Sequence, residues 1–547
     1  MTFINIKSEE RNPSILLFFM FFCIVAASIT GATVRDAVFL IQFDKTFLSI
    51  MFVMVAFFMA LIISIYKRIS SGHDLLKTLI SSNLIFIILL FIFQFNLKGW
   101  WIPGLYLCVE MITILSILQF WILAGEIFNA RQAKRIFTIL GAGGSFAGIG
   151  AGYGIKPFVS TFGSNNLLYL TIIFISLSTI IAIILNPYRN PISKIPITNE
   201  TTSYSDKSLW SFDPYMKSIA LMIGISAFIS KIVDYQFKIV AASSFPIQDN
   251  LVNFFGSYYM ITGGATLIMQ LFFTSAILKR FGIISGLFIL PITLALGSGG
   301  FLILGTLTAV YIAKFSDQVF KFSINNTIQE ILWLPVVPEK KIKRKPTIDG
   351  TIRSIFEGLA GVFIFGLVTF NLIPESKIYL LSFIVLIGII IWSWNNYRLN
   401  NGYVSSLMGA IEKRQLNLDE IQFDVNDSHT IETIKSALNA KDELKQLFAI
   451  DLLWTLPLHP WKQSLNELFY HGTSKVKRGI LELAWHKNYI INNQQIIDLI
   501  VTKGDLTHLA ISCASDRNII ETSELISSYL NSSDLSLKAS ATISILK

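Results

Sequence analysis

The chain has 547 residues, of which 53% are hydrophobic and 14% charged, and its mean hydropathy is +0.60. Ordinary soluble domains carry roughly 25% charged residues, so the composition excludes a typical soluble protein. Residues 1–399 have a net charge of +12 and residues 400–547 a net charge of −3. Because the basic excess lies in the apolar part, it indicates membrane topology rather than nucleic-acid binding. The three cysteines are far apart, which excludes a disulfide framework and a zinc ribbon.

Before residue 399, about twelve apolar stretches have the length of roughly 20 residues that crosses a bilayer. The first follows Lys7 and Arg11 without a small-residue cleavage site, and is therefore expected to be a retained helix. The predicted membrane helices are 14–40, 47–66, 76–97, 101–127, 135–158, 166–186, 215–243, 254–278, 283–304, 306–334, 351–372 and 377–397.

The basic residues outside these helices predict the orientation. Twenty-one of them fall on one side of the membrane, including the cluster at 340–345 and both ends of the apolar region. The other side has four, namely Lys45, Lys98, Lys156 and Lys377. The positive-inside rule then places both termini in the cytoplasm and the chain in the cytoplasmic (inner) membrane.

A Pro/Ser/Thr-rich polar segment at 187–214 separates the sixth predicted helix from the seventh. It is expected to be a cytoplasmic linker between a first half, 1–186, and a second half, 215–399. Two six-helix halves joined in this way are typical of the major facilitator superfamily. The fold class is therefore an all-α membrane protein with twelve transmembrane helices, followed by a helical domain at 400–547.

A charge motif is repeated inside the predicted helices. Residues 231–238 read KIVDYQFK and residues 314–321 read KFSDQVFK, both with the pattern K-x-x-D-x-x-F-K. A partial copy occurs at 35–39, and Glu126 is a weaker echo in the fourth helix. The acidic residues of these motifs have a similar spacing in the first half and in the second half, which indicates an internal repeat.

Positions i, i+3 and i+7 lie within about 60° of one another on a helix, so each motif presents its charges on one face. Charge inside a bilayer is costly, and such faces are expected to line water or to pair with one another. Substrate contact and gating salt bridges both fit, and the sequence leaves the choice open. The candidate residues are Arg35, Asp36, Glu126, Lys231, Asp234, Lys238, Lys314, Asp317 and Lys321. Their charges leave a surplus of +1, which favours an anionic substrate.

Further polar residues extend these faces and are second-rank candidates: Glu110, Tyr235, Gln236, Gln318, Asn325, Asn326 and Glu330. The glycine-rich run at 141–154 lacks the G-x-x-x-x-G-K-[ST] pattern of a phosphate loop, and close helix packing is the better interpretation. No catalytic arrangement and no metal-ligand spacing is found, so neither an enzyme nor a cofactor is expected.

Residues 400–547 have the periodicity of amphipathic helices. Short similar segments recur there, with small residues at Ala449, Gly479, Ala510 and Ala539. A spacing near 30 residues indicates paired helices, which predicts a HEAT-like solenoid; an irregular helical bundle is the alternative.

Several segments resemble the ATP/ADP carrier (Tlc, nucleotide transporter) family. They are ATVRDAVF at 32–39, EIFNARQAKRIFTILGAGGSFAG at 126–148, KIVDYQFK at 231–238, and the stretch from DQVFKFSINN to KPTIDG at 317–350. The resemblance implies a facilitator-type fold, alternating access and nucleotide exchange through membrane-embedded Lys and Glu residues. On these segments it implies phosphate-facing or gating roles for Arg35, Glu126, Lys231, Lys238, Lys314 and Lys321.

The leading hypothesis is a transporter of a small anionic solute such as ATP or ADP. One alternative is a membrane scaffold or sensor whose residues 400–547 recruit a cytoplasmic protein partner. Another keeps transport but moves a lipid or an exported polymer. The lipid bilayer is the one partner common to all three hypotheses, and no nucleic-acid partner is expected.

Overall fold

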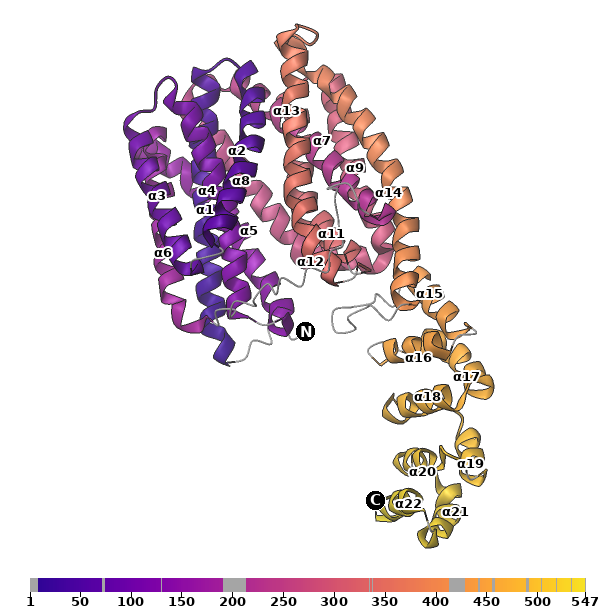
Figure 1. The fold of residues 1–547 in the computed structure, drawn as a ribbon. Helices are drawn as coiled ribbons and strands as arrows, with labels where there is room; N and C mark the ends of the chain where they lie inside the picture. Colours follow the sequence, from indigo (N-terminus) through magenta and orange to yellow (C-terminus); the bar gives the residue numbers. More distant parts are fainter. Residues whose placement is uncertain are drawn as a thin grey trace. The chain divides into compact units, whose positions relative to one another are not determined.

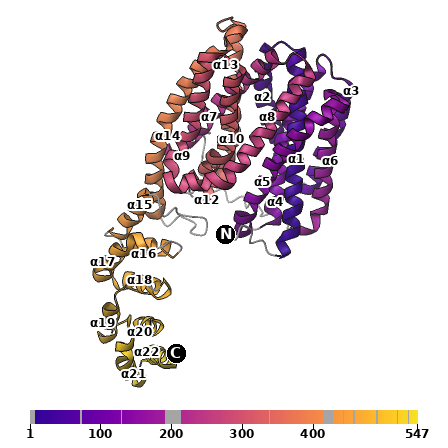
Figure 2. The same ribbon diagram turned by 180° about the vertical axis from the view of Figure 1, so that it is seen from behind.

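The computed structural model describes residues 8–546 except 71–73, 129, 190–212, 334, 337, 413–427, 441–442, 455–457, 488–490, 503, 518 and 533. Every regular element in this described part is helical, as the sequence predicts (Figures 1 and 2). Most of the segment expected to be a linker, 187–214, lies outside the described residues.

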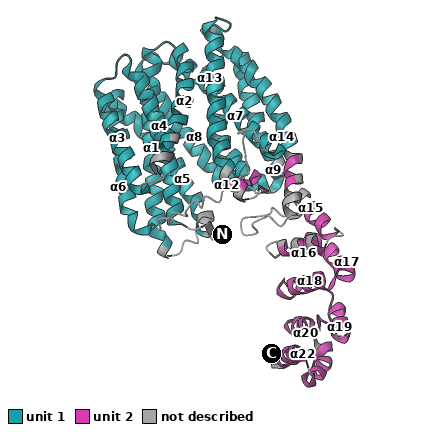
Figure 3. Ribbon diagram, in the orientation of Figure 1, with its two compact units in different colours: residues 1–330, 342–399 teal, residues 331–341, 400–547 magenta. Residues whose placement is uncertain are grey.

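The described chain forms two compact units, coloured separately in Figure 3. Unit 1 contains residues 1–330 and 342–399, and therefore both predicted membrane halves except residues 331–341. Unit 2 contains residues 331–341 and 400–547.

The first half contributes six long or apolar helices to unit 1. They are α1 (Ser8–Gln42), α2 (Thr46–Ser70), α3 (Leu75–Phe95), α4 (Trp101–Ile127), α5 (Ala130–Phe162) and α6 (Leu167–Ile184), with short 3₁₀ turns η1 (Ser164–Asn166) and η2 (Asn186–Tyr188). α1 packs against α4, α5 and α6, and is the central helix of this half.

The second half is more interrupted, because π-helical turns join several of its helices. Its elements are α7 (Pro214–Ser244), α8 (Gln248–Ile268), η3 (Met269–Phe273), α9 (Thr274–Leu304), α10 (Leu307–Phe320), η4 (Lys321–Asn325), α11 (Asn326–Leu332), α12 (Pro338–Pro346), η5 (Thr347–Ile352), α13 (Arg353–Thr369), η6 (Glu375–Leu380) and α14 (Leu381–Glu412).

Ten described helical spans are long and apolar enough to cross a membrane: 10–42, 46–63, 75–95, 101–127, 164–184, 214–244, 248–278, 285–304, 344–369 and 377–399. Neither of the remaining two predicted membrane helices, 135–158 and 306–334, is among these ten spans of the described residues. The first of these ranges lies within α5, and the second covers α10, η4 and α11. Both ranges include polar or glycine-rich stretches, which lower their hydropathy.

Two helix pairs make the most extensive contacts between the halves, and α1 also packs against α7 and α8. α5 packs along α8, and α2 packs along α13. A Cβ atom on Gly152 would lie 2.5 Å from the Met260 amide nitrogen, and one on Gly361 would lie 2.8 Å from the Ser49 carbonyl oxygen. Only glycine permits backbones to approach this closely. The glycine-rich run at 141–154 therefore packs helix against helix.

Two names are used for the ends of the bundle. We call the end where α1 begins the basic end, because the sequence predicts the basic loops on that side, and the end with the loops around Lys45 and Lys98 the opposite end. The close contacts of Gly152 with α8 and of Gly361 with α2 are made toward the opposite end, where α2 and α8 begin.

Unit 2 consists of short helices: α15 (Ser428–Leu438), α16 (Glu443–Leu452), η8 (His459–Trp461), α17 (Lys462–His471), α18 (Ser474–Lys487), α19 (Asn493–Val501), α20 (Thr507–Asp516), η9 (Ile520–Thr522), α21 (Ser523–Ser528), η10 (Tyr529–Asn531) and α22 (Leu535–Leu546). The even-numbered helices α16, α18, α20 and α22 pack in succession, each beside its odd-numbered neighbour. The repeated small residues Ala449, Gly479, Ala510 and Ala539 fall on these four helices. The HEAT-like identity of the unit stays a prediction.

Candidate functional site: an ion ladder across the two halves

A chain of ion pairs begins in the first half, between α1 and α4. Arg35 is buried, and its Nε lies 3.0 Å from Asp36 Oδ1 while its Nη1 lies 3.0 Å from Glu110 Oε1. The guanidinium also lies 4.3 Å from the centre of the Tyr106 ring, a cation–π distance. One arginine therefore forms ion pairs with two carboxylates through two different nitrogens, because its planar guanidinium carries several N–H donors.

Lys238 of α7 joins this group to the second half. Its Nζ lies 3.0 Å from Asp36 Oδ2 and 3.1 Å from Asp234 Oδ2. The Tyr106 hydroxyl is 3.5 Å from the same nitrogen, and the Phe52 ring of α2 is 5.9 Å away. Asp36 thus bridges a cation of its own half and a cation of the other.

The chain of pairs continues from α7 to α10. Lys314 Nζ lies 2.9 Å from Asp234 Oδ1 and 3.7 Å from Asp317 Oδ2. The Ser230 hydroxyl donates a hydrogen bond of 2.6 Å to Asp317 Oδ1 and accepts one of 3.2 Å from Lys321 Nζ. We call the whole series the ion ladder: Glu110, Arg35, Asp36, Lys238, Asp234, Lys314, Asp317, Ser230 and Lys321.

Helical spacing accounts for this order. Asp234 and Lys238 are one turn apart on α7, as are Lys314 and Asp317 on α10, so each pair shares a face. At Lys321 the helix changes to the π-helical turn η4, which shifts the register of the following residues. Lys321 is therefore presented at a break in the helix, where π-turns are frequent in functional sites.

Beyond the ladder, positive charge is less completely matched. Lys231 Nζ lies 3.9 Å from Glu357 Oε2 of α13 and 4.5 Å from the centre of the Phe52 ring. Arg353 and Glu357 are close enough to interact electrostatically with Lys321. Among the described residues, Lys321 has no carboxylate within 4.0 Å. Lys231 and Lys321 thus both lie near Glu357, and Arg353 lies near Lys321. Other carboxylates also act on these cations, since Asp317 interacts with Lys321 and Asp349 with Arg353. We call Lys231, Lys321, Arg353 and Glu357 the cationic group.

Glu126 does not belong to the ladder. Its Oε2 accepts a hydrogen bond of 2.7 Å from Arg189 Nε, and Arg189 Nη2 donates one of 2.7 Å to Asp74 Oδ1. This cluster ties the start of α3 to the end of α4. The Arg189 hydrogen bonds lower the pKa of Asp74, and those to Asp74 and Glu126 raise the pKa of Arg189. Glu126 is at the last turn of its helix, too far along α4 to reach Arg35.

The second-rank candidates also differ in whether they belong to the ladder. Glu110 is a full member of the ladder. Gln236 is turned toward α14, where its amide donates to the Ile378 carbonyl and the Ser382 hydroxyl at 3.1 Å each. Glu330 pairs with Lys345. Of the others, Tyr235 and Asn325 are buried, Gln318 is half-buried and Asn326 is exposed.

Grouped by contact, the charges differ from the sum made from the sequence. The ladder itself has four cations and four carboxylates, because Glu110 replaces Glu126 and Lys231 lies outside it. The surplus resides instead in the cationic group. Neither Arg353 nor Glu357 follows a repeated motif that would mark it as a site residue in the sequence.

No protein-family model matches the chain. Its sequence is 22% identical over 296 residues to "ADP,ATP carrier protein 1" of Chlamydia trachomatis, which covers 46% of this chain and 56% of that protein. It is 26% identical over 341 residues to "ADP,ATP carrier protein 3" of Rickettsia prowazekii, covering 52% and 67%. It is 25% identical over 317 residues to the plastidic ATP/ADP-transporter of Solanum tuberosum, covering 51% and 49%. The chain thus spans about half of the first of these relatives.

Two solved structures resemble the fold. The POT family transporter PepTSo matches 70% of this chain and 98% of its own with a TM-score of 0.53 at 8% identity. A bacterial homologue of the iron transporter ferroportin, in an inward-facing state, matches 71% and 97% with a TM-score of 0.50 at 11% identity. At these identities the likeness concerns the fold. Together with the ten membrane-length helices, it identifies the chain as a multi-pass membrane protein with the fold of known membrane transporters.

Proposed function

We propose that the protein is an alternating-access transporter that exchanges small anionic solutes of the nucleotide type, such as ATP and ADP, across the membrane. The observation that carries this proposal is the ion ladder that connects helices of both halves and ends beside the cationic group. The names of the bacterial and plastidic relatives support the nucleotide part.

The ladder has the properties needed of a reversible connection. Of the ion pairs described above for the ladder, the one between Lys238 and Asp36 crosses from one half to the other. If the halves part, Asp36 keeps Arg35 and Lys238 keeps Asp234, each within its own half. No charge is then left without a counter-ion, so the large penalty for an unpaired buried charge is avoided. Such an arrangement suits a contact that breaks and re-forms in each cycle.

The cationic group suits the solute. Lys231, Lys321 and Arg353 are half-buried, and a phosphate group would supply the negative charge that Glu357 alone does not. Lysine and arginine are the side chains that bind phosphate, lysine as a point charge and arginine with a planar pair of donors. In this proposal the solute binds beside Lys321 and draws it from the Ser230 hydroxyl, which also hydrogen-bonds Asp317. Binding is thereby linked to the ladder.

The test is exchange in proteoliposomes preloaded with ADP and supplied with labelled ATP, ADP, AMP or inorganic phosphate. We expect uptake that depends on the internal solute, and a loss of at least tenfold in the Lys231→Met and Lys321→Met variants. Lys217→Met is the matched control, because Lys217 is an exposed lysine on the same helix as Lys231. Its uptake is expected to equal that of the unaltered protein.

The proposal fails if none of these anions is taken up or exchanged, or if Lys217→Met and Lys321→Met lower uptake equally. Uptake of phosphate without any nucleotide would keep anion transport and reject the nucleotide class.

A further inference from the structure

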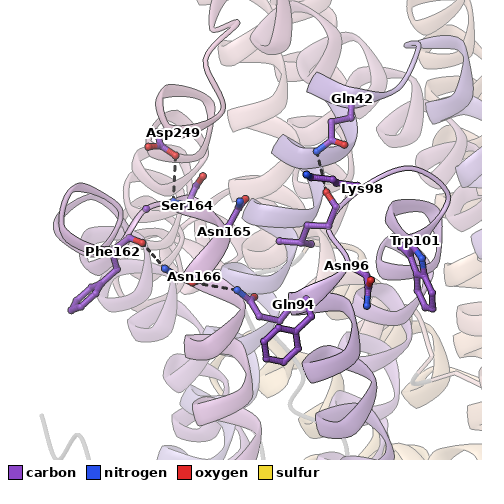
Figure 4. A pocket seen from close by; sticks show the side chains of 13 residues that line it. Gln42, Gln94, Asn96, Lys98, Trp101, Phe162, Ser164, Asn165, Asn166 and Asp249 are labelled. Atoms are coloured by element: carbon purple, nitrogen blue, oxygen red, sulfur yellow. Dashed lines mark hydrogen bonds between the residues drawn. The ribbon is translucent and has the colours of Figure 1, made fainter.

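A cavity of about 920 Å³ opens in unit 1 at the opposite end of the bundle, away from the ion ladder (Figure 4). The segments that surround it are the end of α1, the loop between α3 and α4, the loop between α5 and α6, and the first turn of α8. Its volume lies in the range of small-molecule sites, which is about 300–1,000 Å³.

Hydrogen bonds between these segments hold the walls in place. Gln94 donates to Asn166 at 3.2 Å, and Gln42 donates to the Leu97 carbonyl at 3.3 Å. The α5–α6 loop turns at Gly163, whose φ of +79° favours glycine. That loop is held to the second half, because its Ser164 amide donates to Asp249 at 3.3 Å. The walls thus come from both halves.

The lining is rich in amides and close to neutral. Gln42, Gln94, Asn96, Asn165 and Asn166 all line the cavity. Primary amides carry both donors and acceptors, and the hydrogen bonds of the walls use only part of them. Its charged lining residues are Lys98 and Asp249, one of each sign.

Aromatic side chains complete the lining. Trp101 is 51% exposed and stands against Phe93 at a ring separation of 6.2 Å, and Phe95 and Phe162 also line the cavity. Figure 4 shows Lys98 and Asn165 on facing sides of the opening, with Trp101 beyond Asn96. Amides, one carboxylate and an exposed indole together match a ring that carries hydroxyl groups on its edge and C–H groups on its face.

We propose that this cavity is a second binding site, distinct from the cationic group, for a neutral polyhydroxylated ligand of the sugar type. The hydroxyls bind the amides and Asp249, and the ring face lies on Trp101. An anion is disfavoured because Lys98 is balanced by Asp249. Because Asp249 belongs to the second half and the amides to the first, the ligand favours the arrangement in which the halves are joined at this end.

The test is a saturation-transfer NMR titration of the full chain, purified in a detergent without a sugar headgroup so that the detergent does not compete. One arm uses free glucose and maltose. A second arm uses nanodiscs with and without a monoglucosyl lipid. Saturable binding in either arm supports the site, and the arm in which it occurs identifies a free sugar or a lipid headgroup as the source.

The variants Asn165→Ala and Trp101→Leu are expected to raise the dissociation constant at least tenfold. The matched control Asn250→Ala removes an exposed amide of the first turn of α8 that does not line the cavity, and is expected to leave binding unchanged. Lys321→Met is also expected to bind the sugar normally, which separates this site from the proposed anion transport. Melting temperatures confirm that the variants fold.

The proposal is overturned if no sugar binds saturably in either arm, or if Asn165→Ala and Trp101→Leu bind as the control does. Competition by inorganic phosphate at equal concentration would also overturn it, because a neutral lining gives phosphate no advantage.

Discussion

At the residue scale, Lys238 and Asp36 hold the two halves together. Their side chains are buried, and the Nζ–Oδ2 distance is 3.0 Å. Each of them also has an ion partner in its own half, which distinguishes this pair from an isolated buried salt bridge. Loss of one partner therefore costs less than the ~3–5 kcal/mol typical of breaking an isolated buried pair.

We predict that Lys238→Met and Asp36→Asn each shift the equilibrium toward separation of the halves at the opposite end. In a double-mutant cycle the two changes are expected to couple by about 1–3 kcal/mol, because both remove the same contact. For the measurement, a cysteine is introduced at Asp44, in the loop after α1. The quantity measured is the fraction of molecules in which this cysteine reacts with a thiol reagent. The three native cysteines are buried, so their background labelling is low.

The exposed pair Arg478–Glu482 of α18 is the control for that cycle, since its Nε–Oε1 distance is also 3.0 Å. For this exposed pair, the coupling energy obtained from thermal stability is expected to be below about 0.5 kcal/mol, because solvent screens the two charges. Equal coupling at the two sites would show that the buried pair has no special part in joining the halves.

Asp74 gives a second prediction, in pH dependence. Its pKa in the folded chain is lowered, first of all by the hydrogen bonds from Arg189. A lowered pKa stabilises the fold above the ordinary pKa of the carboxyl, and this contribution is lost as the pH falls through the folded value. The Asp74 side chain is 40% exposed, so the contribution is discounted to about 0.5–1 kcal/mol.

The expected result is that Asp74→Asn melts at a lower temperature than the unaltered protein at about pH 5, with the difference shrinking toward about pH 3. Differential scanning fluorimetry in detergent measures both curves. Lys77→Gln, which removes an exposed charge one turn further along α3, is expected to leave the difference at zero. A difference that stays constant over this range would contradict the assignment.

At the residue scale, the sequence predicts four residues of the ion ladder through one repeated motif. The repeated K-x-x-D-x-x-F-K motif places Asp234, Lys238, Lys314 and Asp317 in one network, because helical periodicity alone sets which side chains share a face. It does not predict the partner of Glu126. That partner, Arg189, follows the sixth helix, and such a contact depends on how helices distant in sequence pack.

At the element scale, α5 and α8 show how glycine brings helices of the two halves together. Gly152 faces the α8 backbone, and a Cβ atom there would lie 2.5 Å from the Met260 nitrogen and 2.7 Å from the Gly256 oxygen. Backbone atoms cannot give way as a flexible side chain does. The prediction of close packing from the glycine-rich run is therefore confirmed, although its partner helix could not be named from the sequence.

We predict that Gly152→Val separates α5 from α8 at the opposite end, increases labelling of the Asp44 cysteine, and lowers exchange at least tenfold. Gly154→Val is the matched control, since a Cβ atom at Gly154 meets nothing within 4 Å. The two glycines are on the same helix, so a difference in helix propensity cannot explain a difference in result. Equal effects of both variants would argue that α5 is sensitive to β-branched residues rather than to contact with α8.

At the scale of the whole molecule, composition predicts the membrane class and the all-helical fold because both follow from apolar length. The number of twelve membrane helices stays a prediction. The stretch 306–334 contains Lys314, Asp317 and Lys321, and the structure divides it among α10, η4 and α11. The charged side chains there lower the hydropathy on which the prediction of a membrane helix depends. The cavity at the opposite end could not be predicted, because segments from four places in the chain build it.

The division into two units leads to a last prediction. The ladder, the cationic group and the cavity all lie in unit 1, whereas residues 413–547 belong entirely to unit 2. A chain ending at Glu412 retains the whole of α14 and every residue assigned to these sites. We therefore expect it to bind and exchange anions within about twofold of the full chain when both are reconstituted in equal amounts.

Lys321→Met in the shortened chain is the control, and is expected to lose exchange as it does in the full chain. If the shortened chain folds, as judged by its melting temperature and size-exclusion profile, yet does not exchange, then residues 413–547 take part in the transport cycle itself. If it exchanges normally, any protein partner of residues 413–547 acts on a transporter that is already complete. The reason is that the ion ladder and the cationic group are both present without those residues.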